Sequence, residues 1–242
     1  MSDKKIIGLS RLITLRQQLD AVARNVANQT TPGFKAGHLR FQEYLTKASE
    51  DDIPSAPMRS LVAATQFIDF SPGLVKPTGN PLDAAIVDDA FFVIETPAGP
   101  RYTRVGAFTL DNEGRLVTLG GMPVLTSVGR VVVSQRDTAL TIGADGSVAT
   151  AQGAIARLRL VRFEDRRKLS VEGQGLFSAE AAALEVPSTQ IRLATGVLET
   201  SNVRPIEEMT KLIAATRAYE LVAQVILKDE AKDELKKLAG ED

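Results

Sequence analysis

The sequence predicts an α+β fold in which two discontinuous terminal helices flank an inserted all-β domain. Apolar residues recur at alternating steps of three and four near both ends of the 242-residue chain, which is the period of paired helices. Between these ends, short apolar runs alternate with polar turn residues, as is typical of antiparallel strands. We therefore expect the N- and C-terminal helices to pair as a coiled coil, with the β-rich part inserted between them.

The C-terminal helix is expected within Leu198–Leu238. Ser201 and Asn202 offer N-cap side chains, and Pro205 suits a first turn. The apolar seam of this helix has a period of 3.5 and consists of Met209, Leu212, Thr216, Tyr219, Ala223 and Ile226. A second apolar stripe consists of Ile206, Ile213, Val222 and Val225. A helix that is apolar on more than one side needs a packing partner.

The partner is expected at the other end of the chain, over residues 5–28. The same spacing recurs there in Leu12, Leu15, Leu19, Val22 and Val26. Together with Met209, Leu212, Tyr219 and Ile226, these five residues are our candidate assembly interface. A plainer alternative is a helical hairpin that closes an ordinary globular domain.

The middle of the chain predicts hairpins. Residues 36–49 favour helical or irregular structure, and residues 49–57 are acidic and Pro-rich, as in a loop. From residue 84 the pattern becomes β, with a turn at Asp88–Asp89 and a single strand over 155–165. Segments 107–118 and 139–150 share one hairpin-like pattern. We expect a helical domain over 1–45 and 198–242, an extended linker over 46–83 and a β-rich outer domain over 84–197.

The composition argues against several classes of function. The chain has no Cys, which removes thiolate catalysis, disulfides and Cys-based metal sites. Its one His, His38, cannot by itself supply a metal site or a Ser-His-Asp triad. Asp88 and Asp89 are adjacent and would point to opposite faces of a strand, so a turn explains them better than an acid–base pair. We expect no catalytic, cofactor or metal site, and no small-molecule substrate.

Charge and hydropathy exclude further classes. The net charge of −1 provides no basic field for nucleic acid. No run of about 18 apolar residues is present. Arg11 and Arg16 interrupt any apolar core of a secretory signal. If the protein works outside the cytoplasm, we expect it to leave without a cleaved leader.

Three motifs carry a resemblance to a known family. The segment AVARNVANQTTPGFKAG resembles the N-terminal signature of the flagellar rod and hook proteins through Asn25, Asn28, Thr31, Gly33, Phe34 and Lys35. Arg24 stands where the family usually has Asn. The segment LETSNVRPIEEMTKLIAATRAYE resembles the C-terminal signature, and its matching residues include Ser201, Asn202, Val203, Arg217, Tyr219 and Glu220.

The middle of the chain also resembles this family. The runs YTRVGAF and GRLVTLGGMPVL match its pattern, whereas Val87, Asp88 and Ala90 depart from it. The start of the chain, FQEYL at 41–45 and EMTKLI are most similar to the proximal-rod (FlgF-type) branch. The resemblance covers essentially the whole chain.

The resemblance implies an axial structural protein of the bacterial flagellar basal body. Its terminal helices would line a tube that transmits torque and encloses the export channel. The implied partners are proximal and distal rod subunits, further copies of this chain and the flagellar type III export apparatus. Three alternatives stay open: a distal-rod or hook protein, a carbohydrate-active enzyme with a carboxylate pair in a cleft, and a surface binding module.

Overall fold

A computed structural model describes residues 3–46, 59–133 and 140–238. The chain divides into two compact units. Unit 1 comprises Met1–Ala27, Gly37–Asp69 and Arg204–Asp242, and unit 2 comprises Asn28–Ala36 and Phe70–Val203. Unit 1 contains both long helices and unit 2 is built from short strands, so the predicted α+β class is confirmed.

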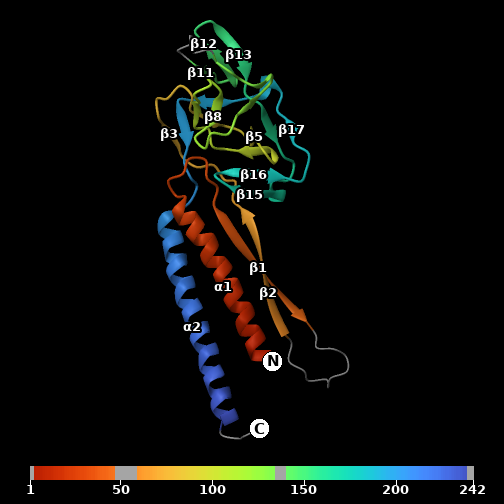
Figure 1. The fold of residues 1–242 in the computed structure, drawn as a ribbon, viewed down its shortest axis with the longest axis vertical. Coiled ribbons are helices and arrows are strands. Elements are labelled where there is room, and N and C mark those ends of the chain that lie inside the picture. Colours follow the sequence, from red (N-terminus) through yellow and green to blue (C-terminus); the bar gives the residue numbers. More distant parts are fainter. Residues whose placement is uncertain (1–2, 47–58, 134–139, 239–242) are drawn as a thin grey trace. The chain divides into compact units, whose positions relative to one another are not determined.

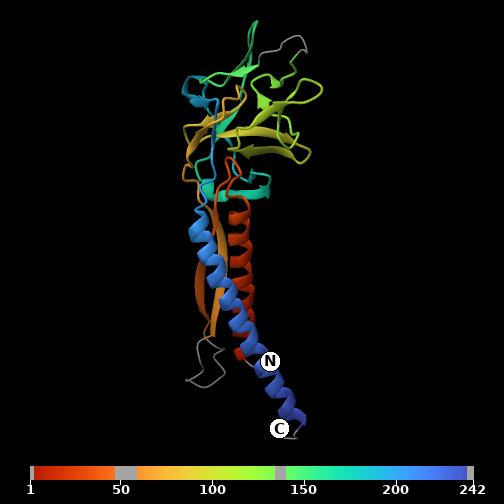
Figure 2. The same ribbon diagram turned by 90° about the vertical axis from the view of Figure 1, so that its left-hand side faces the viewer.

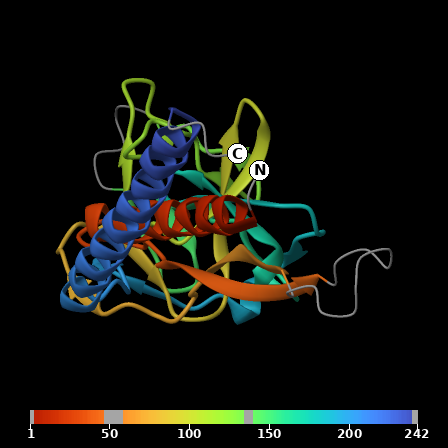
Figure 3. The ribbon, with the colours of Figure 1, turned by 90° about the horizontal axis from the view of Figure 1, so that it is seen from below.

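Unit 1 is a helix pair with a β-ribbon beside it. Helices α1 (Asp3–Ala27) and α2 (Pro205–Leu238) run antiparallel, and α1 lies between α2 and the ribbon (Figure 1). The ribbon consists of strands β1 (Gly37–Thr46) and β2 (Arg59–Ile68). Helix α2 is longer and extends beyond the N-terminal end of α1 (Figure 2). The two helices cross at an angle when they are viewed along unit 1 (Figure 3).

The start of α2 corrects one expectation. Pro205 is the first residue of the helix, as predicted, but Ser201 and Asn202 do not cap it. The Ser201 hydroxyl accepts a hydrogen bond from the Val203 amide at 3.2 Å, and the Asn202 side-chain oxygen accepts one from the Ala36 amide at 2.8 Å. Both side chains therefore stabilise the segment that precedes the helix.

Two further expectations on secondary structure are wrong. Residues 37–46 form strand β1 instead of helical or irregular structure, because they pair over their whole length with β2. The single strand expected over 155–165 is divided into two strands, which belong to different sheets. The acidic loop expected at 49–57 lies wholly within 47–58, outside the described residues.

Unit 2 contains an antiparallel sheet of six strands. In spatial order they are β15 (Leu169–Gly173), β16 (Leu176–Ala179), β6 (Gly99–Thr103), β5 (Phe91–Thr96), β14 (Leu160–Arg162) and β17 (Leu184–Glu185). Two 3-10 turns, Arg166–Lys168 and Ser188–Gln190, join parts of this unit.

Smaller antiparallel sheets complete unit 2. They are β7–β8 (Phe108–Leu110, Leu116–Thr118), β9–β10 (Leu125–Thr126, Gly129–Arg130), β11–β12–β13 (Thr141–Ile142, Ser147–Thr150, Gly153–Arg157), β4–β18 (Ala84–Ile86, Leu193–Thr195) and β3–β19 (Val75–Pro77, Val197–Glu199).

The two related sequence segments both form hairpins, as predicted. In β7–β8 the Asp111 amide donates to the Arg115 carbonyl at 3.0 Å, and in β11–β12 the Gly143 amide donates to the Ser147 carbonyl at 2.7 Å. These bonds occupy equivalent positions in the two segments. The predicted turn at Asp88–Asp89 is also confirmed, as a bend between β4 and β5.

The core of unit 2 uses both faces of its main sheet. Adjacent Phe91 and Phe92 are fully buried and point to opposite faces, as successive strand residues do. The rings of Phe92 and Phe108 pack edge-to-face with their centroids 5.0 Å apart. Both residues belong to the main apolar cluster, whose buried members lie between Ala84 and Leu193 in the sequence. On the other face, Phe91 contacts Phe177 at 5.9 Å. Neither helix in the described chain is long and apolar enough to span a membrane.

Candidate functional site

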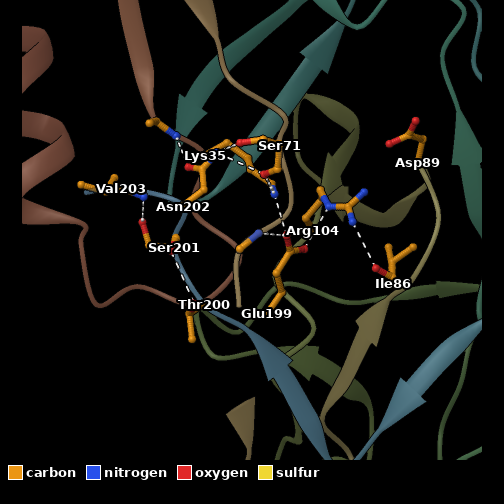
Figure 4. Close-up of polar contacts among 12 residues, drawn as sticks. Lys35, Ser71, Ile86, Asp89, Arg104, Glu199, Thr200, Ser201, Asn202 and Val203 are labelled. Atoms are coloured by element: carbon orange, nitrogen blue, oxygen red, sulfur yellow. Dashed lines mark hydrogen bonds and ion pairs between the residues drawn. The ribbon is translucent and has the colours of Figure 1, made fainter. Parts of the chain in front are cut away.

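The N- and C-terminal motif segments lie against each other in unit 2. We call residues 28–36 the strap. The Gly33 amide donates to the Glu199 carbonyl at 2.7 Å, and the Asn202 amide donates to the Phe34 carbonyl at 3.4 Å. The Asn202 side chain adds the bond to the Ala36 amide, and its amide group donates to the Ser71 carbonyl at 3.1 Å (Figure 4). Asn202 thus fastens the strap to the segment that leads into α2.

Gly33 is the tightest point of the strap. Its φ of +66° lies in the left-handed region, which side chains with a Cβ atom rarely adopt. A Cβ atom at this position would stand 2.8 Å from the backbone carbonyl atoms of Arg104 and from the Val105 nitrogen. Conformation and space therefore both require glycine here.

A buried ionic cluster of Lys35, Arg104 and Glu199 secures the strap. The Lys35 ammonium donates to one oxygen of the Glu199 carboxylate at 2.6 Å, and Arg104 Nε donates to the other at 3.1 Å. The Gly73 amide donates to the first oxygen at 2.8 Å. The three side chains are only 0%, 4% and 3% exposed. One carboxylate therefore joins the strap, the middle of the chain and the C-terminal motif.

The second positive charge of this cluster is balanced by backbone carbonyl groups. Lys35 also donates to the Ser71 carbonyl at 2.7 Å. The Arg104 guanidinium donates to three carbonyls at 3.0–3.1 Å, those of Ile86, Asp88 and Ala90. Buried charges are tolerated where such hydrogen bonds replace water. Arg104 belongs to the YTR run, so the sequence marked it as a family position without indicating its partner.

The environment of Glu199 favours its charged form. Burial by itself raises the pKa of a carboxyl group. The charge of Arg104 and the hydrogen bonds from Lys35 and the Gly73 amide outweigh burial, so the pKa of Glu199 lies below its ordinary value. The carboxylate is therefore ionised at neutral pH.

A second polar cluster, in unit 1, joins α1, β1 and α2. Asn25 is 1% exposed, and its side chain exchanges two hydrogen bonds of 2.9 Å with the backbone of Gly37. It also donates to the buried carboxylate of Glu208 at 2.9 Å, to which Lys211 donates at 2.6 Å. Burial alone would raise the pKa of Glu208, but the bonds from Lys211 and Asn25 hold it below its ordinary value.

The remaining motif residues are less buried, with one exception. Val203 is buried, whereas Asn28, Thr31 and Phe34 are half-buried. The Thr31 hydroxyl bonds to the Asn28 side chain at 3.2 Å within the strap. On α2, Tyr219 is half-buried, and Arg217 and Glu220 are exposed. Arg24, the departure from the family pattern, donates to the Gln66 side chain at 3.3 Å.

The structure places most residues of the predicted helical seam on packed faces. On α1, Val22 is buried, and Leu12, Leu15, Leu19 and Val26 are half-buried. On α2, Leu212, Tyr219 and Ile226 are half-buried, but Met209 is 55% exposed and Thr216 is also exposed. A seam of period 3.5 drifts around a helix of 3.6 residues per turn, by about 20° per heptad.

The centre of the packed face on α2 is shifted by one residue from the predicted seam. Glu208 and Ala215, which each precede an exposed seam residue, are 3% exposed. The predicted apolar seam includes neither residue, because a charged and a small residue do not stand out in an apolar pattern. Large apolar residues are exposed on both helices: Leu9 and Ile13 on α1, and Ile206, Met209, Ile213, Leu221, Val225 and Leu227 on α2.

The charged residues described above act as structural ties. In the described ranges, no group of three His, Asp or Glu side chains is arranged to hold a metal ion. The buried carboxylates of Glu199 and Glu208 are hydrogen-bonded to cationic side chains, and that of Asp83 accepts from Thr78 and Asn80. The arrangement is suited to joining distant chain segments.

Comparisons with known proteins match three parts of the chain to family models. The flagella basal body rod protein model matches residues 7–35, the flagellar hook protein FlgE/F/G D1 domain matches 85–150, and the flagellar basal body rod FlgEFG protein C-terminal model matches 194–228. The first and third of these contain residues of the strap and of the segment that it contacts.

Similar proteins span nearly the whole chain. The flagellar basal-body rod protein FlgF of Caulobacter vibrioides is 37% identical, with 93% of each chain covered. That of Salmonella typhimurium is 35% identical with 88% of each covered. The rod protein FlgG of Bacillus subtilis is 31% identical and covers 94% of this chain. The chain therefore belongs to the family of flagellar basal-body rod proteins, and within that family to the FlgF type.

Proposed function

We propose that this structural subunit of the flagellar basal-body rod assembles helically through α1 and α2, as part of the proximal rod. The helix pair acts as an axial core that associates as a coiled coil with helices of neighbouring subunits. The assembled rod transmits torque and encloses the export channel. Unit 2 supplies the outer domain, and no catalytic step or cofactor is involved.

The observation that carries this proposal is the set of large apolar residues exposed on both helices. Ile206 is 83% exposed, and Met209, Ile213, Leu9 and Ile13 are each more than half exposed. Ile206, Met209 and Ile213 follow at steps of three and four and therefore lie on one face of α2, and such an exposed apolar face marks a protein interface. A head-to-tail contact whose rotation does not close generates a helical filament. Because the chain belongs to the rod family, we infer that its partners are other rod subunits, including copies of this chain and distal rod proteins.

The route to the basal body is the second part of the proposal. We infer export through the flagellar type III apparatus without cleavage of a leader, into the periplasm-spanning rod. This rests on membership in the rod family. Mass spectrometry of the protein in purified basal bodies tests it, and a mature N-terminus that lacks the first residues beyond Met1 would contradict it.

A complementation experiment tests the assembly role. A strain that lacks the gene receives the wild-type protein, Ile213→Asp or Leu184→Asp. Ile213 lies on the exposed side of α2 and is 53% exposed, and Leu184 lies in unit 2 and is 50% exposed. Because a charge on the helix face opposes apolar contact between subunits, we expect Ile213→Asp to remain folded and to build no complete rods. Leu184→Asp is expected to restore rods and motility.

Each outcome bears on the proposal. Rods in the deletion strain itself would overturn the role as a rod subunit. Normal rods with Ile213→Asp, or equal loss with both variants, would overturn assembly through the helices while leaving the family role intact. Circular dichroism of each purified variant verifies that the substitution acts on assembly and not on folding.

A further inference from the structure

The strap differs from the rest of unit 2 in how it is held. Its residues 28–36 contain no helix or strand and form no part of the main apolar cluster, although all of them are described. The buried members of that cluster lie between Ala84 and Leu193. The core of unit 2 is therefore complete without the strap.

The strap is held chiefly by polar contacts. Gly33, Lys35 and Ala36 are its buried residues, and Phe34 is half-buried. Apolar burial therefore contributes little to its docking. Its bonds converge on two residues of the C-terminal motif, Glu199 and Asn202. A segment held by few apolar contacts opens locally at a lower free energy than the core beneath it.

Opening of the strap leaves Glu199 with partners. Arg104 and the Gly73 amide still donate to the carboxylate after Lys35 has left. Lys35, which is fully buried in the closed state, regains its hydration in water. The desolvation of a buried cation opposes closure, and its ion pair and hydrogen bonds favour closure. The balance is set by a small number of bonds and not by a large apolar contact.

We propose that residues 28–36 form a detachable strap, which opens from unit 2 while Phe70–Val203 stays folded. Its two fastenings are the Lys35–Glu199 ion pair and the hydrogen bonds that Asn202 makes with Phe34 and Ala36. Residues of the two family signatures therefore contact each other when the strap is closed. The closed strap connects the chain immediately after α1 with the chain immediately before α2. This device is independent of which subunits the helices contact in the rod.

Thiol labelling of the purified full-length protein tests the proposal. The chain has no cysteine, so a single introduced thiol reports one position. Ala36→Cys reports the strap, where Ala36 is 3% exposed, and Ala107→Cys reports the sheet region, where Ala107 is 4% exposed. In the otherwise unchanged protein we expect the thiol at 36 to react at least tenfold faster than the thiol at 107.

Weakening either fastening should raise the population of the open strap. Lys35→Ala and, separately, Asn202→Ala are expected to raise the labelling rate at position 36 by roughly 10- to 100-fold, the range for loss of a buried hydrogen bond or one to a charged group. The rate at position 107 should stay at least tenfold below the rate at position 36. Lys168→Ala, which removes an exposed lysine of unit 2, is the matched control and should alter neither rate.

Two results would overturn the proposal. Equal labelling rates at positions 36 and 107 would show that the strap is released only when unit 2 unfolds. An unchanged rate at position 36 in both Lys35→Ala and Asn202→Ala would show that these bonds do not hold it. If Lys35→Ala unfolds unit 2, the thiol at 107 reacts rapidly as well, and the milder Asn202→Ala variant then decides.

Discussion

Replacing Glu199 by glutamine tests the ionic cluster most directly. The substitution keeps the shape of the side chain and removes its charge. Glutamine offers one acceptor oxygen, whereas the carboxylate of Glu199 receives bonds from Lys35, Arg104 and the Gly73 amide on two oxygens. In Glu199→Gln the new NH2 group faces donors, and two buried cations are left without a counter-charge.

The expected magnitude follows from burial. Removing one partner from a buried ion pair destabilises a protein by about 3–5 kcal/mol, and the three side chains here are at most 4% exposed. Glu185 provides the matched control, because it accepts from Arg159 at 2.8 Å and its side chain is 64% exposed. Surface pairs contribute about 0–1 kcal/mol. We therefore expect Glu199→Gln to exceed Glu185→Gln by at least about 2 kcal/mol.

Urea unfolding of the full-length protein, followed through a fluorescent reporter in unit 2, compares the two variants. The chain has three tyrosines and no tryptophan. Replacing Tyr44 and Tyr219 of unit 1 by phenylalanine leaves Tyr102, which packs 4.8 Å from Phe163, as the fluorescent reporter of unit 2. The free energy of unfolding is then obtained for each variant in this background. A loss of less than about 1 kcal/mol in Glu199→Gln, similar to the control, would show that the ionic cluster does not stabilise unit 2.

Three further predictions follow from the two clusters. Because the folded-state pKa of Glu199 is lowered, its stabilising effect is present above the unfolded pKa of about 4.3 and is lost as pH falls through the folded pKa. The urea midpoint of unit 2 should therefore decrease when the pH is lowered below about 5. An equally steep decrease in Glu199→Gln would contradict this. A residue with a Cβ atom in the left-handed conformation costs roughly 1–2 kcal/mol, and Gly33→Ala should lower the free energy of unfolding of unit 2 by more than this because of its close backbone neighbours. Gly79→Ala, with φ +75° and no neighbour within 4 Å, should show the conformational cost alone. Equal urea midpoints of the two variants would exclude the steric argument. Asn25→Ala should lower the free energy of unfolding of unit 1 by about 1–3 kcal/mol, because backbone groups of β1 and a carboxylate of α2 lose their partner. Thermal melting followed by helical circular dichroism measures this loss, and the same loss in exposed Gln17→Ala would contradict the prediction.

Local pattern was sufficient for the elements whose signals lie close together in the sequence. The terminal helices and the hairpins of segments 107–118 and 139–150 follow from periodicity and turn residues. The start of α2 at Pro205 also follows from local chemistry. The motif residues indicated the family, because three patterns in the correct order are more specific than any one of them.

Pairing between distant segments was beyond the reach of local pattern. Strand β1 exists because β2 pairs with it, and its own residues predicted helical or irregular structure. The alternation over 155–165 predicts one strand, but the first strand of this stretch ends at Arg157 and the residues that follow pair with different strands. Strand β13 pairs with β12, and β14 pairs with β5 and β17. Alternation indicates which residues face a core and does not specify the neighbouring strand.

The two terminal helices, the hairpin character of the middle and the family of the protein follow from the amino-acid sequence, because each is encoded in spacing along a short stretch. The role of the motif residues is apparent only in the folded chain. Lys35 and Glu199 are 164 positions apart and meet Arg104 in a buried cluster. Such a contact stabilises the fold only because burial excludes water from all three charges, and burial is a property of the folded chain.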